Sequence, residues 1–149
     1  MAAFLIYLVV MAAVLGLWEI QIEGKNGWAE KLPCWRVKKG WIVRIQGGRP
    51  LTGYHFFMNV FLVAMIHLPV FFVSWSWRLE SLLIGSLIGL LVLEDFLWFV
   101  FNPHYGLRNF KKGKIWWHPT WWGPVPDFCW WFSIIAGILI YLGRSSLKT

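Results

Sequence analysis

The chain has 149 residues, of which 58% are hydrophobic and only 14% charged, and this composition excludes an ordinary soluble domain. Its net charge of +7 comes from basic residues between apolar segments, which favours anionic lipid head groups over nucleic acid as partners. Its two cysteines stand far apart without a CxxC motif, which excludes a disulfide framework. The sequence therefore predicts an integral membrane protein.

Four apolar segments follow one another along the chain and predict an all-α fold, an integral membrane four-helix bundle in a single domain. The first covers residues 1–18 and is expected to be retained, because a cleaved signal peptide would need a basic residue before Lys25. The second covers 54–77, the third 81–102 and the fourth 127–143. A helix needs about 20 apolar residues to cross a bilayer, so the fourth segment is short for a span.

Local features suggest how the second and third segments are joined and packed. The short stretch from Arg78 to Glu80 is expected to connect them as an antiparallel hairpin. Gly85 and Gly89 stand four residues apart and could let a neighbouring helix approach closely, or could be ordinary glycines of a membrane helix. His67 lies inside the second segment and is expected to hydrogen-bond a helix carbonyl.

Two long connections hold most of the basic residues. Residues 19–49 contain seven Lys or Arg and residues 103–127 contain four, out of 14 in the chain. With four spans both connections lie on one side, and the positive-inside rule places that side in the cytoplasm and both termini outside. Interfacial segments are expected there, and WIVRIQ (residues 41–46) could be one of them or a short strand. Six Trp within residues 116–132 indicate an aromatic belt or a lid over a polar site.

Glu94 and Asp95 are adjacent carboxylates inside the third apolar segment. A charged carboxylate in a bilayer costs about 2.5–3.5 kcal/mol on insertion scales, so a basic partner, a proton or a metal ion must offset it. The two side chains point about 100° apart around a helix, so they cannot both face one small target. His55, His104 and His118 are expected at the same membrane depth, although they come from different parts of the chain.

This convergence predicts a metal site at the cytoplasmic membrane boundary. Histidine and carboxylate ligands suit zinc, iron or manganese. No HExxH, CxxC or ExxH motif accompanies them. The expected metal ligands are His55, Glu94, His104 and His118, with Asp95 as a catalytic group and with Asn59, Asn102 and Asp127 as polar partners around them.

Three functions remain open from the sequence. The first is a small membrane metalloprotein, which could be a metal-dependent enzyme acting on a lipid or another amphipathic substrate. The second is a homo-oligomer or a non-catalytic subunit, or scaffold, of a larger membrane complex. The third is a proton or ion pathway that uses Glu94, Asp95 and His67.

Overall fold

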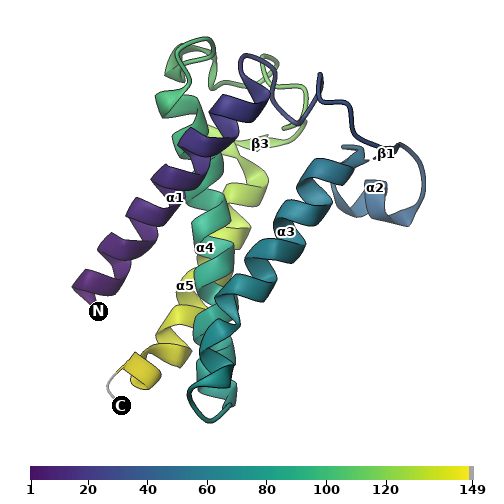
Figure 1. Ribbon diagram of the computed structural model, residues 1–149. Coiled ribbons are helices and arrows are strands. Elements are labelled where there is room, and N and C mark those ends of the chain that lie inside the picture. The colour runs from purple at the N-terminus through teal and green to yellow at the C-terminus, as the bar shows by residue number, and fades with distance from the viewer. Residues whose placement is uncertain (148–149) are drawn as a thin grey trace.

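The computed structural model describes residues 1–147 and is mostly helical, which confirms the all-α class. Its four long helices are α1 (Ala2–Glu23), α3 (Gly53–Ile66), α4 (Trp77–Phe101) and α5 (Asp127–Gly143). Helix α4 lies at the centre and contacts the other three (Figure 1). The start of α1, the end of α5 and the turn between α3 and α4 lie at one end of the molecule, and the two long connections lie at the other (Figure 1).

The short elements belong mainly to the long connections. The short helix α2 (Trp41–Ile45) exposes Trp41 and Ile45 and buries Val43, so the strand alternative for WIVRIQ is wrong. Two pairs of two-residue strands also form: β1 (Arg36–Val37) pairs antiparallel with β2 (Leu51–Thr52), and β3 (Trp121–Trp122) pairs antiparallel with β4 (Val125–Pro126). The 3-10 helices are Leu68–Phe71, Leu107–Asn109 and Arg144–Leu147.

Two helices, α1 and α4, are long and apolar enough to cross a membrane. Helices α3 and α5 are also apolar, but they have only 14 and 17 residues. Large apolar side chains on the outer surfaces are exposed, for example Ile6 on α1, Phe57 on α3 and Ile138 on α5. The structure therefore has two candidate membrane spans, whereas the sequence predicts four.

The turn between α3 and α4 comes earlier than the sequence predicts. Helix α3 ends at Ile66, and Pro69, which has no amide proton to donate, lies in the 3-10 helix that follows. Helix α4 begins at Trp77 because the Ser76 hydroxyl accepts a hydrogen bond from the Leu79 amide, which caps the helix start. Arg78 and Glu80 therefore lie in the first turn of α4 and form no connection.

Helices α4 and α5 pack tightly through glycines. A Cβ atom at Gly85 would lie 2.8 Å from the Leu139 Cβ and 2.9 Å from the Ile140 nitrogen. A Cβ atom at Gly143 would lie 2.5 Å from the Leu82 nitrogen. Only glycine permits this backbone separation, because a small residue at a helix crossing lets the two backbones approach closely.

The core has two parts, both of which involve α1 and α4. Ala12, Leu15 and Leu90 form a small apolar cluster at the middle of these helices. A larger cluster lies where the long connections fold over the helix ends, and its buried members are Ile20, Trp98, Phe99, Ile115 and Trp117. The second cluster holds the second long connection against the end of α4.

Candidate functional site

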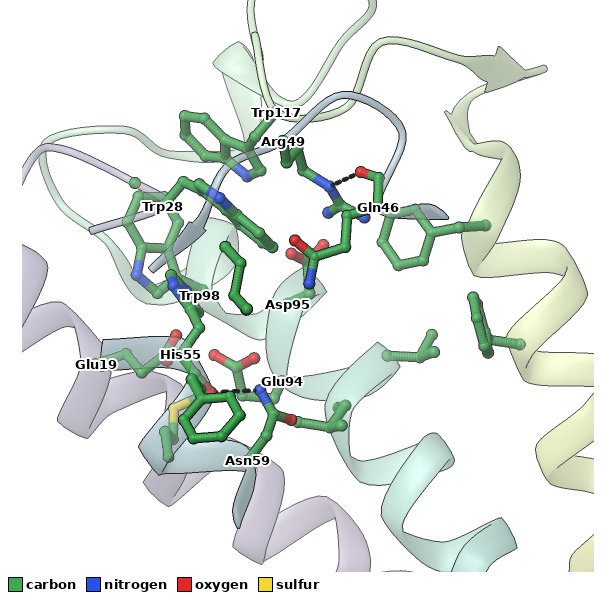
Figure 2. A pocket seen from close by; sticks show the side chains of 18 of the residues that line it. Glu19, Trp28, Gln46, Arg49, His55, Asn59, Glu94, Asp95, Trp98 and Trp117 are labelled. Atoms are coloured by element: carbon green, nitrogen blue, oxygen red, sulfur yellow. Dashed lines mark hydrogen bonds between the residues drawn. The ribbon is translucent and has the colours of Figure 1, made fainter. Parts of the chain in front are cut away.

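A cavity of about 790 Å³ lies where α1, α3 and α4 meet the first long connection (Figure 2). One part of its wall is polar, and the residues there are Glu19, Glu23, Arg49, His55, Glu94 and Asp95. Another part is apolar, with side chains that include Val60, Val63, Ala64, Ile88, Leu91 and Val92. Trp28, Trp98 and Trp117 add aromatic surface to the polar part.

Four carboxylates reach this cavity from two helices. Glu19 and Glu23 stand one turn apart on α1, while Glu94 and Asp95 are adjacent on α4. Helix α1 approaches α4 closely at Gly16, where an added Cβ would lie 3.4 Å from the Glu94 carbonyl oxygen. Glu19, Glu23 and Glu94 are each less than 8% exposed. Burial of three carboxylates in one region is costly unless each one finds a partner or a proton.

The two carboxylates of α1 have hydrogen-bond partners on α3 and in the loop after α1. The Tyr54 hydroxyl donates to Glu19 Oε1 at 3.2 Å. Glu23 Oε1 accepts the amide proton of Ala29, and it also lies 3.8 Å from His55 Nε2. Glu23 therefore ties the loop after α1 to the start of α3.

His55 and Arg49 both pack against Trp28. The imidazole of His55 stacks on Trp28 at a centroid distance of 4.4 Å, and its Nδ1 lies 2.7 Å from the Thr52 hydroxyl. The Arg49 guanidinium lies 4.5 Å from the Trp28 ring centroid, and its Nε donates to the Gln46 carbonyl (Figure 2). The indole thus already holds one cation against its ring.

Burial lowers the pKa of the Arg49 guanidinium, and the carboxylates of Asp95 and Asp127 act in the opposite direction. An arginine stays protonated under these conditions because its ordinary pKa is so high. Arg49 is therefore a built-in positive charge on the side of the cavity where Asp95 lies (Figure 2).

Asp95 and Glu94 face different parts of the site, as the angle between adjacent helical residues requires. Asp95 Oδ2 lies 3.1 Å from His118 Nε2, but the two atoms are not aligned for a hydrogen bond. His118 is 2% exposed and stacks on Phe128. Figure 2 shows Asp95 near Gln46 and Arg49, and Glu94 on the side of the cavity where Glu19 and Asn59 lie. The two acids therefore have separate environments.

Several buried polar atoms of the cavity wall have no hydrogen-bond partner among the described residues. Glu94 Oε1, Asp95 Oδ2 and Gln46 Oε1 are acceptors, and Trp98 Nε1 is a donor. Such atoms are rare in folded proteins, because each one loses its hydrogen bonds with water and gains nothing in return. These four atoms belong to residues that line the same cavity.

The predicted metal ligands are not gathered at one point. His55 lies beside Glu23, His118 lies beside Asp95, and His104 is exposed, with its backbone amide donating to the Asn102 side chain. Within residues 1–147, no three His, Cys, Asp or Glu side chains are close enough together to hold one metal ion. Both cysteines are free thiols.

The predicted polar partners differ in their roles. Asn59 lines the cavity and donates to the His55 carbonyl at 2.7 Å. Asn102 is buried and donates to the Gly24 carbonyl at 2.8 Å, so it joins the ends of α1 and α4. Asp127 starts α5 and accepts a hydrogen bond from the Thr120 hydroxyl.

His67 lies far from the acid pair. Its Nδ1 is 2.7 Å from the Val63 carbonyl oxygen, as expected for a histidine that bonds a helix carbonyl, and its Nε2 is 3.1 Å from Glu80 Oε1. Glu80 is in the first turn of α4, and Glu94 follows about four turns later, roughly 20 Å along the helix. The structure does not bring His67 to Glu94 and Asp95.

Glu19, Glu23 and Arg49 line the cavity, but sequence reasoning assigned them only to a long connection. One signal could have identified the two acids, since a spacing of four residues directly after an apolar helical segment places them on one helix face.

Comparisons of the chain with protein-family models, with curated proteins and with solved structures gave no match.

Proposed function

We propose that this protein is a small integral membrane protein whose cavity binds a lipid or another amphipathic molecule. The observation that carries the proposal is the division of the cavity wall into a polar and an apolar part. Ligand sites are mostly apolar cavities with a few placed polar groups, and this volume falls in the usual range for a small molecule.

The polarity of the wall changes along the helix axis. On α3, His55 precedes Ala64 by about nine residues, and on the antiparallel α4, Ile88 precedes Glu94. The polar groups of both helices therefore lie toward the long connections, and the apolar groups lie further along the bundle (Figure 1). A head group would bind among the acids, and a hydrocarbon chain would lie between α3 and α4.

This orientation agrees with the membrane arrangement that we propose. All four long helices cross or enter the bilayer, with the long connections at the cytoplasmic surface and both termini outside. Apolar side chains exposed on α1, α3 and α5 would contact lipid tails. Lys111, Lys112 and Lys114 of the second connection would meet anionic head groups.

Metal dependence stays a prediction, with zinc, iron or manganese as the candidate ions. The predicted ligands are His55, Glu94, His104 and His118, which are of the types that these ions bind, and Asp95 beside His118 is the predicted catalytic group. Elemental analysis checks this: a metal ion present in the wild type and lost in Glu94→Gln supports it, and equal content in both contradicts it. A role as a complex subunit also stays a prediction.

Native mass spectrometry of protein extracted from membranes tests the binding of an amphipathic molecule. We expect a lipid-sized adduct on the wild type and its loss in Ala64→Trp, because the indole would fill the apolar part of the cavity. Ala3→Trp, an equal substitution at an exposed position of α1, is the control and should keep the adduct. No adduct on the wild type, or the same adduct on both variants, would contradict the proposal.

A further inference from the structure

The polar part of the cavity contains more carboxylates than fixed positive charges. Four acids line it, from α1 and α4, and among the lining residues Arg49 is the fixed cation. Arg49 lies beside Trp28 and on the side of Asp95, while Glu94 lies on the opposite side (Figure 2). Glu94 is 6% exposed, and none of the Arg, Lys or His side chains in the described chain lies within ion-pair distance of it.

The unpartnered atoms of the wall have an excess of acceptors. Three of them are oxygen atoms, on Glu94, Asp95 and Gln46, and one is the indole nitrogen of Trp98. A ligand that satisfies this wall must donate more hydrogen bonds than it accepts. An ammonium group has three N–H donors and no acceptor, whereas a carboxylate only accepts and would also be repelled by the four acids.

The aromatic surface beside the acids favours the same kind of ligand. Trp98 stands one turn after Glu94 on α4, and Trp117 and Phe99 line the cavity next to it. A cation near an indole face is stabilised by the charge distribution of the ring, and more strongly where water is excluded. Arg49 against Trp28 shows that this cavity already accommodates such a contact.

We propose that the occupant of the cavity is a long-chain amine or an amino lipid, and that the carboxylate of Glu94 receives its ammonium group. The inference rests on the proposed function, because it assigns the head group of the amphipathic molecule whose chain lies between α3 and α4. Glu94 pairs with the ammonium group, Trp98 lies against it, and Asp95 remains with Arg49 and His118.

Binding of three probes with the same hydrocarbon chain tests the head group directly. Dodecylamine, dodecanol and dodecanoate are titrated into the purified full chain in uncharged nanodiscs, and binding is followed by calorimetry and native mass spectrometry. We expect the amine to bind most tightly and the carboxylate least. In Glu94→Gln the affinity for dodecylamine should fall roughly thirtyfold or more, as when one partner of a buried charge pair is removed. The affinity for dodecanol should not change.

The control is Glu80→Gln, which makes the same substitution at the other end of the same helix and should bind all three probes like the wild type. Retained dodecanol binding shows that Glu94→Gln is folded. If Glu94→Gln does not bind dodecanol, the inference is tested by the wild type alone, which must bind dodecylamine more tightly than dodecanol.

The outcomes separate the two proposals. Equal binding of amine and alcohol overturns the amine inference and leaves the proposed function intact. Binding of none of the probes contradicts both. Tighter binding of dodecanoate that requires added zinc also overturns the inference and would favour a metal-bridged anionic head group instead.

Discussion

Glu80 and Glu94 are carboxylates on the same helix in opposite situations. Glu80 is partly exposed at the start of α4, and its partners are Trp75 and His67, which are close in sequence. Glu94 is buried near the other end, among residues from α1, α3 and the first long connection. The comparison teaches that an acid in an apolar helix becomes a candidate site where distant segments enclose it and leave one of its oxygen atoms, here Glu94 Oε1, without a hydrogen-bond partner.

The two halves of α4 also differ in how tightly they pack. Toward Glu80, Gly85 and Gly89 face α5, and Gly85 leaves no room for a side chain. Toward Glu94, the helix faces the cavity on the side of α3. One half of α4 is therefore packed tightly against α5, and the other half lines the cavity.

The largest expected loss of stability comes from a substitution in the tightly packed half of α4. Gly85→Ala places a methyl group 2.8 Å from the Leu139 Cβ and 2.9 Å from the Ile140 backbone nitrogen, so α4 and α5 must separate. We expect a loss of about 3 kcal/mol in the free energy of unfolding, measured by denaturant titration in micelles. Gly89→Ala is the matched control, because its methyl group meets only ordinary contacts from 3.6 Å. Equal losses in both variants would contradict the difference in packing.

The next effect concerns the end of α4 beyond Glu94. Asn102→Ala removes the hydrogen bond to the Gly24 carbonyl and the acceptor of the His104 amide, at a position that is 1% exposed. We expect a loss of about 2 kcal/mol in the free energy of unfolding, because buried polar groups are left unsatisfied. Asn59→Ala should cost much less, since the exposed Asn59 side chain bonds only a carbonyl of its own helix. A larger loss at Asn59 would argue against Asn102 as the link between α1 and α4.

The smallest effect is expected at Glu80 itself. Glu80→Gln weakens its contacts with His67 and Trp75 near the surface, where an ion pair contributes at most about 1 kcal/mol. The free energy of unfolding should therefore change by less than that amount, again in denaturant titration. A change as large as that of Asn102→Ala would show that Glu80 stabilises the turn between α3 and α4 more than its exposure implies.

Hydropathy alone identified the helical character and the approximate position of each long helix. The observed α5 (Asp127–Gly143) coincides with the fourth predicted segment, and α4 extends the third by four residues at its start. The second segment was predicted too long, because its composition stays apolar through the turn that follows Ile66. Composition reports the environment of a segment, and it does not report where backbone hydrogen bonding stops.

Only part of the candidate site could be predicted from the sequence. Glu94, Asp95 and His55 were placed at one depth from sequence, and all three line the cavity. His104 was placed there by the same reasoning, but it is exposed, whereas His118 of the same connection is buried against α4 and α5. Depth along a bundle can be estimated from segment order, but the direction of a loop side chain cannot.

What the sequence determined by itself is the apolar helical class, the order of the helices and the end of the bundle at which the polar residues gather. Only the tertiary structure decided that α1 continues to Glu23 and that Gly16 brings it against α4, so that Glu19 and Glu23 join Glu94. The physical reason is that a hydropathy pattern describes only how polarity changes from residue to residue along the chain. Which side chains enclose a cavity depends on helix rotation, close approach and loop folding, which are set by packing between distant segments.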